Sequence, residues 1–127
     1  MSYYNLKDKV VVVTGASSGI GEAIAVEVAS KGAKLVLAAR NTEKLNILAK
    51  VISSKGHEVL CVTTDVSNID DCKRLIDSAV ERFGTIHVLI NNAGISMRAL
   101  FKDLDISVIE KLMSVNFWGA VYCTKFA

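Results

Sequence analysis

The sequence contains no apolar run near the roughly 20 residues that a membrane-spanning helix needs, so a membrane protein is not expected. Residues 1–9, MSYYNLKDK, are polar and lack the apolar core of a signal peptide. Together these two absences predict a cytoplasmic protein that has no membrane partner.

An excess of charge of either sign is also missing. The chain has 15 Lys and Arg residues against 13 Asp and Glu residues, a net charge of +2, and its acids and bases are interspersed. Because nucleic acids are bound through clustered positive charge, nucleic acid is not an expected partner.

Cysteine is scarce. The three cysteines, Cys61, Cys72 and Cys123, are widely spaced and form no CxxC pair. An odd number without the spacing of metal ligands is typical of reduced, buried thiols rather than of disulfides or metal sites. We therefore expect no metal site.

What the sequence does contain is enough apolar material for one folded domain over residues 1–127. Hydrophobic residues make up 51% of the chain and charged residues 22%, which are ordinary values for a globular protein. A chain of this length buries roughly 65% of the surface that its unfolded form exposes. No repeat, linker or low-complexity tract divides it.

Two patterns alternate along the chain. Apolar, largely β-branched runs at residues 10–14, 34–38, 58–62 and 87–90 have the length of strands buried on both faces. The segments between them have helical spacing, and the stripe expected on the first helix consists of Ile20, Ala23, Ile24, Val28 and Ala29. This alternation predicts an α/β fold with a doubly wound parallel sheet.

Polar residues and glycines mark the ends of the expected helices. Thr42 and Ser67 are the predicted N-caps of the second and third helices. A glycine follows each of the first three helices and suits a left-handed stop there: Gly32, Gly56 and Gly84. The last helix is expected to begin near Asp105 or Ser107, and neither glycine nor proline ends it.

A glycine-rich turn, Thr14-Gly15-Ala16-Ser17-Ser18-Gly19-Ile20-Gly21, joins the first strand to the first helix. Glycines allow a sharp turn and close approach of the backbone to a pyrophosphate, and a helix N-terminus offers free N–H groups to it. The spacing is G-x3-G-x-G rather than the more general G-x-G-x-x-G. A tight turn without any ligand is the alternative interpretation.

Three further motifs follow in order: Asp65-Val66, then Asn91-Asn92-Ala93-Gly94, then Asn116. With the glycine-rich turn, they make the whole chain resemble the short-chain dehydrogenase/reductase family. The resemblance implies a Rossmann-type sheet with strand order 3-2-1-4, here incomplete, with its first four strands and the helix after the fourth. It also implies that the turn binds a dinucleotide through Gly15, Ser17, Ser18, Gly19, Ile20 and Gly21.

The resemblance assigns roles to the other motifs. Asp65 would accept a hydrogen bond from the adenine amino group, and Val66 would offer its backbone there. The adenosine side of the cleft would be lined by Asn92, Ala93 and Gly94. Asn116 matches the family's catalytic asparagine, whose backbone carbonyl binds a water molecule that is part of a proton relay. The helix is expected to be locally disturbed at this residue. A helix-start acid at Asp65 and a surface residue at Asn116 are the alternatives.

The end of the second strand predicts which cofactor is preferred. Ala39 stands where family members that prefer NAD carry an aspartate, and Arg40 follows it. A guanidinium can form a bidentate contact with a 2′-phosphate, and Ser17 and Asn41 can add hydrogen bonds. We therefore expect NADP(H) to be preferred over NAD(H).

The family's catalytic Ser, Tyr and Lys lie beyond Asn116 and have no counterpart here. Tyr3 and Lys7 have the Tyr-x-x-x-Lys spacing but precede the first strand, and Tyr122 and Lys125 are one residue too close. The 127 residues are expected to be inactive alone, as a fragment of an NADP(H)-dependent oxidoreductase that acts on a carbonyl or alcohol. The alternative is a non-catalytic NADP(H)-binding module that associates through its open sheet edge. The resemblance also implies a homo-oligomer, formed partly through the helix that contains Asn116.

Overall fold

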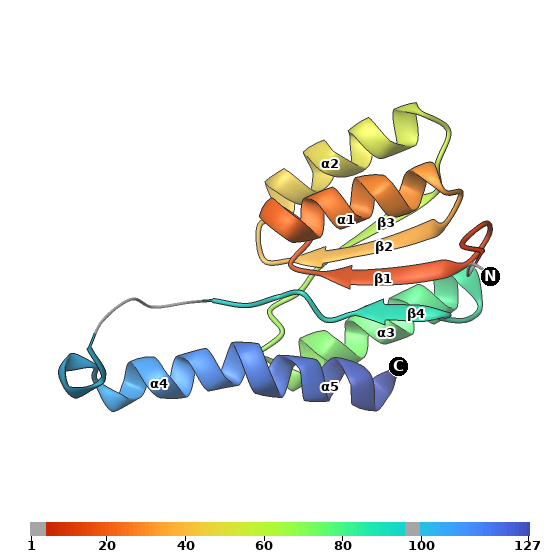
Figure 1. Cartoon of the computed structure of the whole chain (residues 1–127). Helices are drawn as coiled ribbons and strands as arrows, with labels where there is room; N and C mark the ends of the chain where they lie inside the picture. Colours follow the sequence, from red (N-terminus) through yellow and green to blue (C-terminus); the bar gives the residue numbers. More distant parts are fainter. Residues whose placement is uncertain (1–4, 96–99) are drawn as a thin grey trace, which may run out of the picture.

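The computed structural model describes residues 5–95 and 100–127, so Tyr3 lies outside the described residues. The elements follow one another in the expected alternation (Figure 1): β1 (Val10–Thr14), α1 (Gly19–Ser30), β2 (Lys34–Ala39), α2 (Thr42–Ser54), β3 (Val59–Thr63), α3 (Ile69–Phe83), β4 (Val88–Ile90), the 3₁₀ turn η1 (Phe101–Asp103), α4 (Ile106–Met113), the π-helical segment η2 (Ser114–Trp118) and α5 (Gly119–Phe126).

The four strands form one parallel sheet in the order β3-β2-β1-β4, which confirms the predicted topology. Val12 of β1 lies between Val36 of β2 and Leu89 of β4 in the register. Helices α1 and α2 cover one face of this sheet, and α3 and α5 lie against the other (Figure 1). The fold is therefore doubly wound, as the alternation of short apolar runs and helical stripes predicts.

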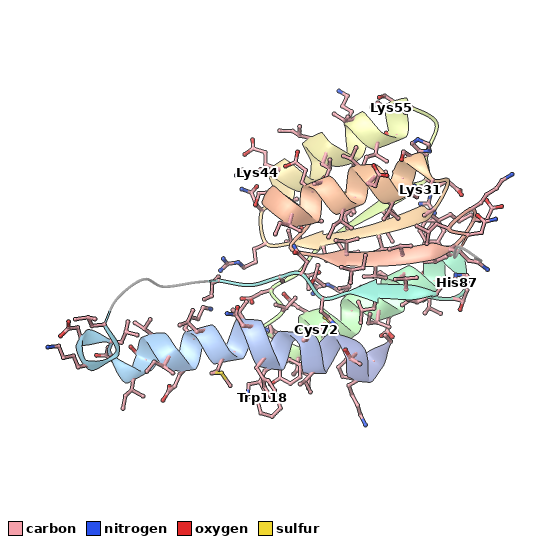
Figure 2. All side chains as sticks on the ribbon, viewed as in Figure 1. Lys31, Lys44, Lys55, Cys72, His87 and Trp118 are labelled. Carbon is pink, nitrogen blue, oxygen red and sulfur yellow. The ribbon has the colours of Figure 1, made fainter. Side chains whose placement is uncertain are left out.

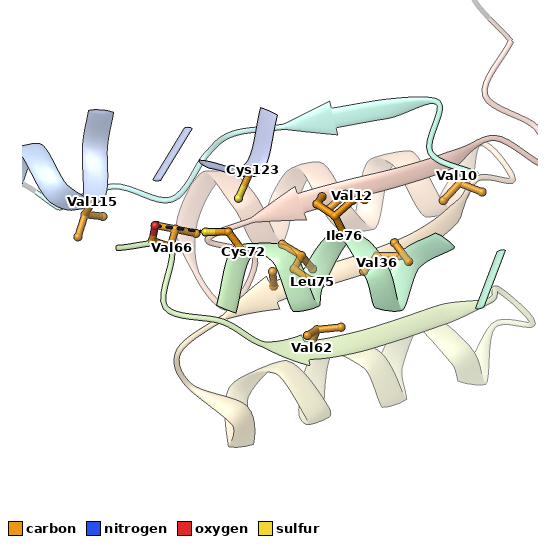
Figure 3. Close-up of a cluster of buried hydrophobic side chains, with 12 residues drawn as sticks. Val10, Val12, Val36, Val62, Val66, Cys72, Leu75, Ile76, Val115 and Cys123 are labelled. Carbon is orange, nitrogen blue, oxygen red and sulfur yellow. Dashed lines mark hydrogen bonds between the residues drawn. The ribbon is translucent and has the colours of Figure 1, made fainter. Parts of the chain in front are cut away.

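Alternate residues of β1 enter two separate hydrophobic clusters. Val11 and Val13 pack with α1 and α2, whereas Val10 and Val12 pack with α3. Leu75 and Ile76 of α3 point toward the sheet in this second cluster (Figure 3). Because both faces are covered, β1 needs apolar side chains at every position, and this is why its sequence reads as an unbroken run of valines.

The predicted N-caps of α2 and α3 were both wrong by one residue. Oδ1 of Asn41 accepts a hydrogen bond from the backbone N–H of Lys44, and Oδ1 of Asn68 accepts one from Asp71. Asn41 rather than Thr42 therefore caps α2, and Asn68 rather than Ser67 caps α3. In both helices a candidate Ser or Thr lies beside an asparagine, and sequence alone does not rank two adjacent good caps.

The buried face of α1 agrees only in part with the predicted stripe: Ala29 is buried and Ile24 and Val28 pack against the cluster, but Ile20 and Ala23 are exposed. Its fully buried residues are Gly21, Ala25 and Ala29, whereas Ile20 is 73% exposed. Small residues four apart allow the helix axis to lie close to β1, so the closest contact consists of Gly and Ala rather than of the larger side chains. The larger Ile24 and Val28 lie beside this closest contact and are only partly buried.

The glycines after the first three helices confirm the predicted left-handed stops. Gly32, Gly56 and Gly84 all have positive φ angles, between 85° and 86°. Asp105 caps α4 by accepting a hydrogen bond from the N–H of Ser107, as expected for the start of this helix.

The three cysteines are free thiols. Burial raises the pKa of the Cys72 thiol to about 12, and burial also raises the pKa of Cys61 and of Cys123. The Cys72 Sγ–H donates a hydrogen bond to the carbonyl of Val66, so the buried thiol has a hydrogen-bond partner within the core (Figure 3). Within residues 5–95 and 100–127, no His, Cys, Asp and Glu cluster of three could hold a metal. No helix in that part of the chain is long and apolar enough to cross a membrane.

His87 closes the amino-terminal end of the sheet (Figure 2). Its backbone N–H donates to the carbonyl of Val10, and its ring Nδ1 accepts the N–H of Val10 at 2.9 Å. The residue is exposed, but its ring is hydrogen-bonded to a strand that is buried. The imidazole thus supplies the acceptor that the first residue of β1 lacks.

Replacing His87 with Ala should lower the free energy of unfolding by about 1–3 kcal/mol, because the N–H of Val10 would lose its acceptor. His87→Asn should lower it less, since the Asn Oδ1 can accept in place of Nδ1. Chemical denaturation measures both variants. His57→Ala, at the start of β3, is the matched control, and an equal loss for His57→Ala and His87→Ala would contradict the assigned hydrogen bond.

Candidate active-site cleft

A cavity of about 290 Å³ lies at the carboxyl ends of the four strands. It is lined by Gly15, Ser17, Ser18, Ala39, Arg40, Asn41, Thr64, Asp65, Val66, Asn92, Ala93, Gly94, Ile95 and Val115. Every residue predicted to bind cofactor is in this lining except Gly19, Ile20 and Gly21, which form the adjacent first turn of α1. In parallel α/β sheets, ligands bind at this end of the strands.

Two of the turn glycines are required by contacts within the protein. A Cβ at Gly15, where φ is +65°, would lie 2.8 Å from the Cα of Ala93. A Cβ at Gly21 would collide with the carbonyl oxygen of Gly15 and the side chain of Asn92. A side chain at Gly15 would therefore collide with the segment after β4. Gly19 differs, because a Cβ there meets nothing within 4 Å.

The hydroxyl of Thr14 joins the glycine-rich turn to the segment that follows β4. Its Oγ1 accepts the backbone N–H groups of Asn92 and Ala93, both at 3.0 Å, and donates to the carbonyl of Ile90 at 3.4 Å. The Asn92 side chain then donates from Nδ2 to the carbonyl of Gly15. Sequence analysis did not give Thr14 a role, although its place between a valine strand and the first glycine was a usable signal.

The N-terminus of α1 is arranged differently from those of the next three helices. Side chains of Asn41, Asn68 and Asp105 accept first-turn N–H groups of α2, α3 and α4. Ser18 stands at the N-cap of α1 but makes no such bond. The first-turn N–H groups of α1 therefore remain available to an anion, and the helix dipole favours negative charge there.

Asp65 and Arg40 are the ionisable side chains in the described lining of the cavity. Oδ1 of Asp65 accepts both the hydroxyl and the backbone N–H of Ser67, at 2.6 and 3.0 Å. The Ser67 hydroxyl is the largest cause that holds the pKa of Asp65 below its usual value, with smaller contributions from the charges of Lys111 and Arg40. Asp65 is therefore ionised at neutral pH, and its Oδ2 accepts no hydrogen bond from the part of the chain described.

Asn116 lies in the π-helical segment η2, which agrees with the expected local disturbance of the helix. Its Oδ1 accepts the N–H of Ile95, and its Nδ2 donates to the carbonyl of Ile95, each at 2.7 Å. Asn116 is not itself in the cavity lining, but Ile95 is. The side chain thus holds the backbone of Ile95 against the helix.

Four lining residues were not among the predicted site residues: Ala39, Thr64, Ile95 and Val115. The backbone N–H of Thr64 donates to the carbonyl of Ala39, which extends the β2–β3 pairing to the cleft. Val115 is buried and packs with Val66 in one hydrophobic cluster. These residues face the cleft because of packing between elements, which no local motif signals.

The family model described as short chain dehydrogenase matches residues 9–127. Among curated proteins, the chain is 45% identical over 129 residues to 11-beta-hydroxysteroid dehydrogenase-like 2 of Arabidopsis thaliana, covering 100% of this chain and 42% of that protein. It is 46% identical over 121 residues to 11-beta-hydroxysteroid dehydrogenase A of Sesamum indicum, covering 94% of this chain and 35% of that protein. The chain therefore spans less than half the length of these relatives.

Solved structures show the same fold. A short chain dehydrogenase/reductase from Burkholderia phymatum in complex with NAD superposes with a TM-score of 0.94 at 35% identity, covering 98% of this chain and 44% of that one. An alcohol dehydrogenase from Thermococcus sibiricus complexed with 5-hydroxy-NADP gives a TM-score of 0.91 at 34% identity, covering 94% and 52%. With its family match, its strand order and the cleft at the carboxyl ends of the strands, this chain belongs to the short-chain dehydrogenase family.

Proposed function

We propose that the protein is an NADP(H)-dependent oxidoreductase that moves a hydride between the nicotinamide and a carbonyl or alcohol substrate, and that this chain supplies the cofactor site. The observation that carries the proposal is the uncapped N-terminus of α1 beside the cavity. A pyrophosphate there would accept the first-turn N–H groups, as the side chains of Asn41 and Asn68 do in α2 and α3.

The open space at Gly19 fits the same assignment. Gly15 and Gly21 are tightly packed against Ala93 and Asn92, so the turn is rigid on its inner side. At Gly19 the outer side is free, which leaves room for phosphate oxygens near the start of α1. Ser17 and Ser18 line the adjacent cavity wall and offer hydroxyl groups to it.

Arg40 supports the preference for NADP(H). It directly follows β2, lines the cavity and is exposed, and the preceding Ala39 carries no acid that would repel a 2′-phosphate. Oδ1 of Asn41 accepts the N–H of Lys44 in capping α2, and its amide nitrogen can donate to a phosphate. The guanidinium is therefore the main 2′-phosphate ligand in this proposal.

At the adenine end, Asp65 is suited to accept the exocyclic amino group. The hydrogen bonds from Ser67 orient Oδ1 and keep the carboxylate ionised, and Oδ2 remains available. The bound nicotinamide would supply or accept the hydride. Asn116 contributes by positioning Ile95, at the wall that follows Gly94.

A carbonyl or alcohol is the proposed substrate class, and the names of the plant relatives make a hydroxysteroid the first alcohol to test.

We also propose a homo-oligomer. The supporting observation is the exposed apolar surface of the helix that contains Asn116, where Phe117 and Trp118 are 49% and 46% exposed. Trp118 points away from the sheet (Figure 2) and stacks on Tyr122.

Arg40→Asp should invert the cofactor preference. The carboxylate would repel the 2′-phosphate and could accept the ribose hydroxyls of NAD(H), so NADPH affinity should fall by about tenfold or more while NADH affinity is kept or rises. Fluorescence titration with both cofactors measures the ratio. Arg82→Asp, in the last turn of α3, removes the same charge elsewhere, and an unchanged NADPH to NADH ratio in Arg40→Asp would refute the assignment.

Gly19→Glu should abolish binding of either dinucleotide, because a carboxylate would occupy the space proposed for the pyrophosphate. Gly56→Glu is a closely matched control: Gly56 also has a positive φ and open space around its Cβ position, but it follows α2 away from the cleft. Both variants place a side chain at a positive φ angle and add one negative charge. Retained NADPH binding in Gly19→Glu, at the level of Gly56→Glu, would contradict the pyrophosphate site.

A further inference from the structure

The helix that contains Asn116 packs closely against Val66, the residue after Asp65. At Gly119 the helix approaches so closely that a Cβ would lie 2.6 Å from Cγ2 of Val66. Four residues earlier, Val115 packs with Val66 and lines the cavity. Val115 and Gly119 therefore both pack on Val66 across the π-helical segment. Lys111 lies about one helical turn before Val115, in the last turn of α4.

Lys111 is exposed, and among the described residues it belongs to no salt bridge. Its ammonium is nevertheless close enough to Asp65 for its charge to help lower the pKa of that carboxyl, as does the charge of Arg40. Arg40 follows β2 and Lys111 belongs to α4, so the two cations come from different elements. Asp65 and the mouth of the cleft are thus in the field of both.

The charge balance of the cleft gives this second cation a consequence. Arg40 and Asp65 are the oppositely charged side chains in the described lining, so their charges cancel. A dinucleotide carries two pyrophosphate charges, and a 2′-phosphate adds about −1.5 to −2 more near neutral pH. A second positive charge beside Asp65 would give the cleft a net positive charge. This charge increases the affinity for NADP(H) more than for NAD(H), because NADP(H) is more negative.

Resting on the function proposed above, we propose that Lys111 is a second cofactor-specificity residue, which offsets the charge of Asp65 and increases the preference for NADP(H) over NAD(H). It acts through its charge at the adenosine end of the cleft, together with Arg40. Its position about one turn before Val115, which packs on Val66 and lines the cavity, places it there. The absence of a salt-bridge partner in the described part of the chain leaves its charge available.

The test compares Lys111→Gln with Lys125→Gln on the full chain. Lys125 is an exposed lysine in the last turn of α5, so both variants lose one positive charge from the same long helix. Titration with NADPH and NADH at low ionic strength should show NADPH affinity about threefold to tenfold weaker in Lys111→Gln, with a smaller change for NADH. Lys111→Arg should restore the wild-type ratio.

Salt and Arg40→Asp separate the outcomes. The effect of Lys111→Gln should shrink at about 0.5 M salt, where the Debye length falls to a few ångströms. If wild-type protein binds NADPH, Arg40→Asp abolishes its preference, and Lys111→Gln still matches Lys125→Gln, the inference about Lys111 is overturned and the proposed function stands. If wild-type protein binds neither cofactor, the proposed function fails and takes this inference with it.

Discussion

The cleft depends on one side-chain hydroxyl, that of Thr14, which holds the end of β4 against the glycine-rich turn. It accepts two consecutive backbone N–H groups, from Asn92 and Ala93, just where the β1–β4 pairing ends. This contact brings the Asn92 side chain to the Gly15 carbonyl and leaves no space for a Cβ at Gly15 or Gly21. Turn, helix and strand end are therefore packed as one unit, and the cavity lies on the outer side of it.

The fold was readable from the sequence because its strands are buried on both faces. Valine runs of strand length and amphipathic stripes on α2 and α3 predict a parallel sheet covered on two sides, and the resemblance adds the order 3-2-1-4. The errors occurred where two local choices have similar energies. Asn41 and Asn68 each lie beside a Ser or Thr that caps almost as well, and α1 packs through small residues that carry little hydrophobic signal.

The site was predictable to the extent that motifs are local. The glycine turn, Arg40, Asp65 and the segment after β4 do converge on one cavity, as their positions at strand ends imply. Contacts across elements were not predictable in the same way. Nothing near His87 in the sequence indicates that its ring accepts the N–H of Val10, 77 residues away. Likewise, the pairing of Asn116 with both backbone groups of Ile95 follows only from the folded geometry.

The number of residues in the π-helical segment at Ser114–Trp118 determines which side of α4 faces the cleft. Such a segment behaves as a one-residue insertion in an α-helix. Deleting one residue from it would restore continuous α-helical winding and turn α4 by about 100° about its axis relative to α5. The charge of Lys111, which now acts on Asp65, would then be turned away from the cleft although the residue itself is unchanged. Among homologous chains, an insertion or deletion at this point of the helix would therefore change the cleft as much as a substitution in its lining.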